Sequence, residues 1–283
     1  MYSDSTHLKA NANKNKFENI EVTQTPKSYL RELDEAVAAD REAHGKKALR
    51  EKDESPTPPT KNIKSSTTDP ESGFMHRDGK PKGFFYLDHR TVDSKANIIT
   101  DVFVTPGNVN DVEPYIDRLK TQIDKFGFEV ETVGLDAGYN VANICRKLHE
   151  MEINGAMGYR RGCQQKGKYA KWKFKYLKEW DVYICPERNY LEYYKDICYE
   201  FTKTDAGKEI YARRKETIER SFADSKELHG LRYCRMRGRE KVSEQCLLTA
   251  AVQNIKRIAT LLHRRCSSVP YRFLLIFRKF GSA

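Results

Sequence analysis

One aspartate stands where a carboxylate is costly to place. In ETVGLDAGYN, Asp136 follows the apolar run that ends at Leu135, which is predicted to be a buried strand, and it precedes a helix start. A carboxylate that leaves water without a partner loses several kcal/mol, so Asp136 must be paired, hydrogen-bonded or bound to a cation. α/β sheets place their ligands at the carboxyl ends of strands. The alternative is a helix cap, which is the commoner role of an isolated aspartate.

A second carboxylate lies on a basic helix late in the chain. In YARRKETIERSFADSK, Glu219 and Lys226 are seven residues apart, which places them on one helical face two turns from each other. Four more cations surround them: Arg213, Arg214, Lys215 and Arg220. Such a face suits a polyanion held beside an acid. It also suits a solvated surface whose i,i+4 pairs, such as Lys215 with Glu219, contribute a few tenths of a kcal/mol each.

The composition favours a polyanionic partner. The 283 residues include 51 Lys and Arg against 40 Asp and Glu, for a formal net charge of +11. Nucleic acid is the first candidate and an acidic membrane surface the second. Near the end, YRFLLIFRKF is broken by Arg272 and Arg278 and is shorter than the ~20 residues of a spanning helix, so no membrane span is expected. The seven cysteines are odd in number and lack a CxxC pair, which indicates reduced cytosolic thiols.

The hydrophobic patterns predict a mixed α/β core. Residues 83–93 and 97–107 are β-rich and are expected to form neighbouring antiparallel strands. An amphipathic helix over 110–127 ends at Gly127, a strand over 128–138 carries Asp136, and a helix over 141–151 begins after Asn140 as its N-cap. Ahead of them, 28–52 is predicted to be an exposed helix and 53–73 a linker.

The second half adds a β-rich segment and two helices. In KGKYAKWKFKYLK, aromatic and basic residues alternate at strand period, which gives a strand with one aromatic face and one face that either grips phosphates or is simply solvated. Helices are expected over 206–228 and 240–264. The second is apolar over much of its surface and is therefore predicted to be buried.

Three stretches together resemble a known family. SDSTHLKANANK, GLDAGYN and RRKETIERSFADSKELHGLRY resemble the DDE transposases of bacterial insertion sequences, in the branch whose first aspartate lies in a D-x-T motif. The resemblance runs from about residue 1 to residue 263. It implies a ribonuclease-H-like α/β fold with a mixed sheet, flanking helices and a β-rich insertion. The expected division is 1–27 stub with the first aspartate, 28–72 helical arm and linker, 73–158 first part of the core, 159–207 insertion, 208–265 C-terminal helices and 266–283 tail.

The resemblance also assigns site residues. It implies Asp4, Asp136 and Glu219 as the catalytic and metal-binding acids, with DNA contacts from Lys226 and from the neighbouring Arg213, Arg214, Lys215 and Arg220. The family's arginine four residues before the glutamate is Lys215 here, and its tyrosine seven residues before is Ala212, with Tyr211 next to it. On the residues alone, Asp88 in GFFYLDHRTVD competes with Asp4 for the first position. Asp69 is expected to be a turn residue.

The implied activity is metal-dependent hydrolysis of a phosphodiester at a transposon end, followed by strand transfer of the 3′-hydroxyl into target DNA. Three close carboxylates need cations, and oxygen ligands suit two Mg²⁺ or Mn²⁺ ions, whereas no His/Cys cluster points to zinc. The expected partners are double-stranded DNA (transposon ends and target) and a second copy in a homodimer, with no small-molecule substrate and no membrane.

The resemblance further implies a bacterial, cytoplasmic, nucleoid-associated protein. Because no separate end-binding domain precedes the core and the strand of Asp4 begins so abruptly, truncation at the N-terminus is expected. Two alternatives stay open. The chain could be another two-metal nuclease or resolvase on the same fold, or an inactive DNA-binding remnant of a transposase.

Overall fold

A six-stranded mixed sheet forms the centre of the protein. The structure is a computed structural model that describes residues 1–23, 60–76, 82–158, 173–177, 182–184, 190–192 and 194–267. The strands are β1 (Tyr2–Lys9), β4 (Gly73–Met75), β5 (Gly83–Val92), β6 (Ile99–Pro106), β7 (Thr132–Leu135) and β8 (Asn154–Met157). Their order is β4-β5-β1-β7-β8, and β6 also pairs with β5. β1 runs antiparallel to β5 and parallel to β7, as β7 does to β8.

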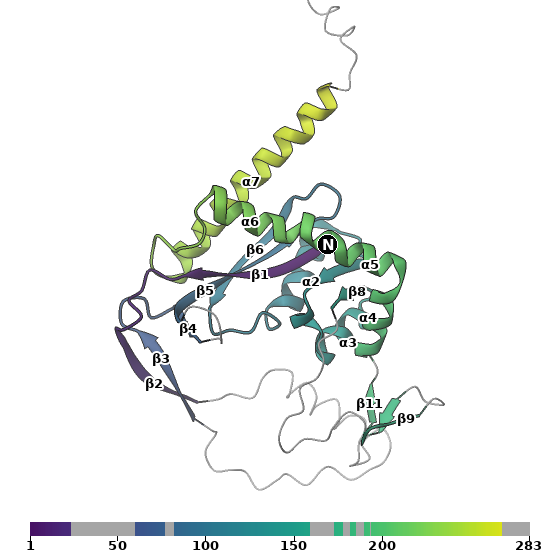
Figure 1. Cartoon of the computed structure of the whole chain (residues 1–283), viewed down its shortest axis with the longest axis horizontal. Coiled ribbons are helices and arrows are strands. Elements are labelled where there is room, and N and C mark those ends of the chain that lie inside the picture. Colours follow the sequence, from purple (N-terminus) through teal and green to yellow (C-terminus); the bar gives the residue numbers. More distant parts are fainter. Residues whose placement is uncertain are drawn as a thin grey trace, which may run out of the picture.

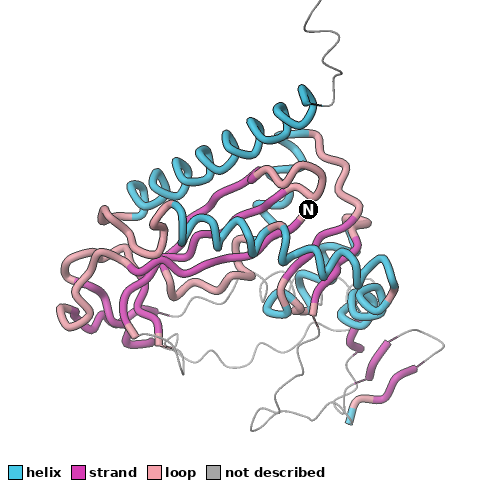
Figure 2. Tube along the Cα trace, turned by 45° about the horizontal axis from the view of Figure 1, so that its top comes forward, coloured by secondary structure: helices cyan, strands magenta, loops and turns pink. Residues whose placement is uncertain are grey.

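Helices cover both faces of this sheet (Figure 2). Adjacent residues of β5 show the two sides, because side chains alternate along a strand. Arg90 donates to Ser225 on α6 (Ile218–Leu228), whereas Thr91 accepts from Gln122 on α2 (Tyr115–Phe126). α7 (Arg239–Ser267) lies with α6, while α3 (Ala142–Glu150), α4 (Tyr194–Lys203) and α5 (Asp205–Ala212) pack around β7 and β8. This arrangement confirms the expected α/β class and is consistent with a ribonuclease-H-like fold.

Local patterns set several of these elements. The predicted hairpin is β5 and β6, which pair antiparallel from Tyr86↔Pro106 to Val92↔Ile99. α2 ends at Gly127, whose left-handed φ of 62° a glycine adopts without steric cost. Behind β7, the largest core cluster joins α2, α3 and the strand through Leu119, Ile144 and Leu135. The strand that precedes Asp136 is therefore buried, as its apolar run predicted.

A buried ion pair holds the helices to the other face. Asp88 and Arg90 on β5 are fully buried, and Arg90 Nη2 lies 2.7 Å from Asp88 Oδ2. Burial raises the pKa of Asp88, and the charge of Arg90 acts against that rise. Arg90 also donates to Ser225 on α6 at 2.6 Å and to Gln253 on α7 at 3.3 Å. One guanidinium thus links strand, α6 and α7, and Asp88 is closed to solvent.

The beginning of the chain differs from the prediction. The strand of Asp4 is no stub, since β1 has eight residues and pairs with β5 over its whole length. A second unexpected pairing joins β2 (Phe17–Thr23) to β3 (Thr60–Ser66), and β3 lies in the segment that was predicted to be a linker. Cross-strand contacts stabilise this hairpin: Ile20 pairs with Ile63, and the Lys64 ammonium lies 4.1 Å from the Phe17 ring centroid. The helical arm predicted over 28–52 lies outside the described residues.

The β-rich insertion is only partly β. A small antiparallel sheet joins β9 (Lys175–Leu177), β10 (Val182–Ile184) and β11 (Tyr190–Glu192). Ten residues from Tyr194, YKDICYEFTK, form α4 instead of a strand, because Cys198 is buried against β8 and α3 and this packing overrides β propensity. Most of the alternating aromatic and basic stretch, including Trp172, lies outside the described residues.

The last helix is less buried than predicted. Val242, Cys246 and Ala250 pack against the sheet, but the helix continues beyond the sheet edge and projects from the body (Figure 1). Six large apolar side chains of α7 are exposed: Leu247, Leu248, Val252, Ile255, Ile258 and Leu262. The apolar composition of α7 predicted a buried helix, but only one side of its first half is buried.

Replacing Arg90 in the buried pair with an apolar residue should cause a large loss of stability. Arg90→Leu leaves the Asp88 carboxylate buried without its counter-ion, which should lower the free energy of unfolding by ~3–5 kcal/mol in urea denaturation. The control is Arg146→Leu, which removes a partly exposed pair with Glu150 and should cost less than ~1 kcal/mol. Equal losses in the two variants would contradict the role given to Arg90.

Candidate active site

The register of two parallel strands brings two of the predicted acids to one level. Tyr2 of β1 pairs with Gly134 of β7. Asp4 lies two residues beyond Tyr2, and Asp136 lies two residues beyond Gly134, so both side chains point to the same face at the same edge. Glu219, in the first turn of α6, comes to this edge from the helix that crosses above it. The structure therefore gathers Asp4, Asp136 and Glu219, which are 132 and 83 residues apart in sequence.

One guanidinium lies among the three carboxylates. Arg214 Nη2 donates to Asp4 Oδ2 at 2.8 Å. Its Nη1 lies 3.6 Å from Asp136 Oδ1 and 3.9 Å from Glu219 Oε1. The Arg214 side chain is only 5% exposed, whereas those of Asp136 and Glu219 are about half exposed. A single buried cation thus faces three acids at the open edge of the sheet.

A break in the late helix places Arg214 there. The helix predicted over 206–228 is divided into α5 and α6 by a 3₁₀ turn over Arg213–Glu216, and Thr217 leaves helical geometry with φ −110° and ψ −94°. The Thr217 hydroxyl donates back to the Arg213 carbonyl at 2.8 Å. The resemblance placed Lys215 at the position of the expected arginine, but Lys215 is exposed and Arg214 points to the acids. Tyr211 lies three residues before Arg214, and its ring centroid lies 5.5 Å from the guanidinium carbon.

A glycine makes room for this arrangement. A Cβ on Gly134 would lie 2.5 Å from the Tyr2 ring, closer than any side chain tolerates, and 3.6 Å from Cγ of Arg214. The missing side chain lets Tyr2 pack across β7, whereas the distance to Arg214 is that of an ordinary van der Waals contact. This glycine therefore helps to set the position of β1, the strand that carries Asp4.

Asp136 is not a helix cap. The residues after it form a 3₁₀ turn, Ala137–Tyr139, and the side chain of Asp136 makes no capping hydrogen bond there. α3 begins later, with Val141 at its N-cap position rather than Asn140. The carboxylate is thus directed to the Arg214 side of the sheet edge, and the capping interpretation of the sequence is wrong.

Burial makes Asp4 an unusual acid. Loss of hydration raises its pKa from the ordinary 3.8 to about 6, while Arg214 and the Ser5 backbone N–H, 2.8 Å from Oδ1, favour the charged form. The negative charges of Asp136 and Asp111 add to the rise. Asp111 precedes α2 in NVNDVE and was not singled out from the sequence. Its Oδ1 is buried and accepts no hydrogen bond from the described residues. A cation at this edge would favour ionised Asp4.

The donor chemistry suits a hard divalent cation. Asp4, Asp136 and Glu219 offer only carboxylate oxygens, the ligands that Mg²⁺ and Mn²⁺ prefer. In the part of the chain that the structure describes, no three acids, histidines or cysteines are grouped closely enough to hold a metal. The guanidinium of Arg214 lies in their midst instead. The same three acids would hold a metal only if Arg214 moved away.

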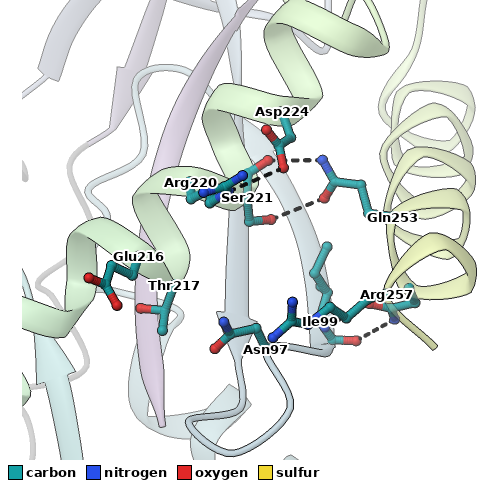
Figure 3. A pocket seen from close by; sticks show the side chains of 10 residues that line it. Asn97, Ile99, Glu216, Thr217, Arg220, Ser221, Asp224, Gln253 and Arg257 are labelled. Atoms are coloured by element: carbon teal, nitrogen blue, oxygen red, sulfur yellow. Dashed lines mark hydrogen bonds and ion pairs between the residues drawn. The ribbon is translucent and has the colours of Figure 1, made fainter. Parts of the chain in front are cut away.

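The predicted DNA-contacting residues surround this edge. Arg213, Lys215 and Arg220 are exposed and Lys226 is half-buried, and Arg213 also donates to the Ser94 carbonyl. Arg220 lines a hollow between α6 and α7, where it lies beside Asp224, with 4.0 Å between Nε and Oδ2 (Figure 3). The hollow lies beside the acid cluster and contains none of the three acids.

Sequence reasoning missed a basic loop after α6. The loop over 229–238, together with the first residue of α7, contains RYCRMRGR (232–239), and the side chains of Arg232, Arg235 and Arg237 are exposed. Their backbone is fixed to the end of β1, because the Lys9 N–H donates to the Arg232 carbonyl and the Cys234 N–H to the Lys9 carbonyl. The run of four arginines in eight residues, Arg232 to Arg239, was the available signal.

Residues 159–259 match the family described as "Transposase DDE domain". The match covers about a third of the chain and includes Glu219 and Lys226, while Asp4 and Asp136 lie outside it. No curated protein and no solved structure matches the chain. The match supports a relationship with the DDE transposases and a transposase function. None of the described helices is both long and apolar enough to cross a membrane.

The raised pKa of Asp4 predicts a stability change in a defined pH window. Between its ordinary pKa of 3.8 and about 6, the folded protein holds the proton more tightly than the unfolded chain does. The associated stability is therefore complete below about pH 4 and is lost as the pH rises to about 6. Over this window, the free energy of unfolding of the wild type should fall by up to ~3 kcal/mol relative to Asp4→Asn. Urea denaturation of both proteins at a series of pH values measures this difference in the free energy of unfolding.

Asp224→Asn is the matched control, because Asp224 lies on α6 outside the acid cluster. This variant should keep the wild-type pH profile. Parallel profiles for the wild type and Asp4→Asn would show that Asp4 does not titrate as its burial requires.

Proposed function

We propose that this chain is the catalytic domain of a DNA transposase. It hydrolyses a phosphodiester at a transposon end and then joins the new 3′-hydroxyl to target DNA. The observation that supports this proposal best is the convergence of Asp4, Asp136 and Glu219 on one cation at the edge of a mixed sheet. The family match over 159–259 agrees with it.

The three acids act as holders of two Mg²⁺ or Mn²⁺ ions, the metals that suit DDE chemistry. When bound, such ions activate the attacking water or 3′-hydroxyl and stabilise the leaving oxygen. The chain supplies the positions. Asp4 and Asp136 lie on paired strands of a rigid sheet, and the Ser5 N–H orients the Asp4 carboxylate. Glu219 lies on a helix that the Arg90 network holds to that sheet.

The basic residues around the acids bind the DNA backbone. Arg213, Lys215, Arg220 and Lys226 lie on α6 and the turn before it, and the arginines of the 229–238 loop extend the surface toward Lys9. Phosphate contacts of this kind give affinity and register without reading sequence. We propose both the transposon ends and the target as double-stranded partners, in the cytoplasm and nucleoid of a bacterium.

The exposed face of α7 supports the proposed homodimer. Leu248, Val252, Ile255 and Leu262 follow spacings of four, three and seven residues, which is the pattern of a coiled-coil seam. An apolar stripe of this length on a projecting helix is unusual for a surface that stays in water. A second copy of the same helix presents the matching seam.

Two alternatives use the same site. A two-metal nuclease or resolvase would cleave DNA without joining ends. An inactive DNA-binding remnant is favoured by one observation: Arg214 lies where the acids would share a metal.

Loss of any one acid should abolish the chemistry. Asp4→Asn, Asp136→Asn and Glu219→Gln should each lower Mg²⁺-dependent cleavage and strand transfer by at least ~100-fold, because each removes a ligand of the shared ions. The assay uses a duplex that carries the terminal sequence of the element encoding the chain, with a target plasmid. Asp224→Asn, on the same helix as Glu219, should keep wild-type rates.

The outcomes separate the candidates. Cleavage without joining would identify a nuclease, and DNA binding without either step would identify a remnant. Cleavage that survives Asp136→Asn and Glu219→Gln would show that the acids are assigned wrongly.

The basic face makes a separate prediction for DNA binding. Arg220→Ala and Lys226→Ala should each weaken duplex binding and lower the slope of log K against log salt concentration by ~1, because each removes one phosphate contact. Fluorescence anisotropy of a labelled duplex at several salt concentrations measures the slope. Lys120→Ala, which removes an exposed lysine on α2, should leave it unchanged. Equal slopes for all variants would place the DNA elsewhere.

A further inference from the structure

We propose that Arg214 is the built-in counter-cation of the acid cluster, and that a divalent metal binds there only by displacing its guanidinium. This inference rests on the proposed function, which makes Asp4, Asp136 and Glu219 the metal-binding acids. It adds a residue that competes with the metal and holds the acids together in its absence.

The geometry carries the first step. Three carboxylates bring three negative charges to one sheet edge, and like charges this close oppose folding unless a cation lies among them. Arg214 supplies that cation through Nη1 and Nη2, at 2.8 Å from Asp4, 3.6 Å from Asp136 and 3.9 Å from Glu219. The site therefore forms without metal, and the arginine takes the place between the acids.

The second step is that this cation can be exchanged. Among the described residues, the guanidinium donates one hydrogen bond, to Asp4, and the contacts to Asp136 and Glu219 are longer charge contacts. Its buried Nε has no hydrogen-bond partner there. The residue lies in a 3₁₀ turn next to the break at Thr217, not inside a continuous helix. When the side chain turns away it gives up this hydrogen bond, the two longer charge contacts and its contact with the Tyr211 ring, and bonds from the acids to a divalent ion would replace them.

The third step is that both cations cannot remain. A guanidinium within 4 Å of all three acids fills the space that they would share around a metal, and a monovalent and a divalent cation in contact repel each other. Binding of the metal must therefore expel Arg214 from the cluster. The wild-type protein should bind metal more weakly than the same three acids would without the arginine.

The test is Mn²⁺ binding to the full chain without DNA, measured from the electron paramagnetic resonance signal of free Mn²⁺ or by calorimetry. Arg214→Gln should bind Mn²⁺ at least ~10-fold more tightly than the wild type, because a competing positive charge is gone. Arg214→Lys keeps the charge and should stay within a few-fold of the wild type. Arg213→Gln removes a neighbouring exposed arginine and should change the affinity by less than ~2-fold.

Thermal unfolding provides the second measurement. Without metal, Arg214→Gln should melt below the wild type because the acids lose their counter-cation. Saturating Mn²⁺ should raise its melting temperature more than that of the wild type, since tighter binding to the folded state stabilises more. Equal or weaker Mn²⁺ binding by folded Arg214→Gln would overturn the proposal and make Arg214 a residue that supports the metal site.

A double variant separates this inference from the proposed function. Asp136→Asn with Glu219→Gln, made in the Arg214→Gln background, should lose the tightened binding. If Mn²⁺ still binds tightly, the metal lies elsewhere and the assignment of the acids is wrong. If binding is lost but Arg214→Gln alone had shown no tightening, the acids are right and only the displacement of Arg214 is wrong.

Discussion

Repulsion between three neighbouring carboxylates is the constraint around which this structure is built. Asp4, Asp136 and Glu219 come from two strands and a helix, and nothing in their own chemistry favours their meeting. The guanidinium of Arg214 makes the meeting possible. Its position depends in turn on the 3₁₀ break before α6. A regular helix through residues 206–228 would direct other cations to the acids.

The position of the third acid depends on a second, buried charge pair. Ser221 and Ser225, one turn apart on the inner side of α6, both face the guanidinium of Arg90, and the Phe222 ring lies 5.2 Å from its central carbon. Arg90 is held by Asp88 on the same strand. Because α6 cannot slide without breaking these contacts, Glu219 at its start stays at the edge of the sheet. The buried Asp88–Arg90 pair thus determines the position of the exposed carboxylate of Glu219.

The periodicity of the sequence correctly predicted those elements whose formation depends on residues close together in the chain. The β5–β6 hairpin, α2 with its end at Gly127, and the buried strand before Asp136 all follow from short patterns. β1 and the β2–β3 hairpin were missed because polar side chains alternate there, and pairing with distant strands decides their length. α4 was not predicted because its formation depends on the packing of Cys198 against the core. α7 is exposed because it extends beyond the sheet, and composition does not show how far a helix extends.

For the site, strand-end and helix-face arguments identified Asp136 and Glu219 as notable acids, and the family resemblance supplied Asp4. These arguments named Arg214 only as one of several DNA-contacting cations, and they could not predict its position among the acids because that position arises from a helix break. The two aspartate–arginine pairs on one face of the sheet show why burial matters more than residue type. Arg90 is enclosed and donates to Asp88, Ser225 and Gln253, so its pair with Asp88 is structural. Arg214 donates to Asp4 at an open edge, so the same chemistry leaves this carboxylate able to exchange one cation for another.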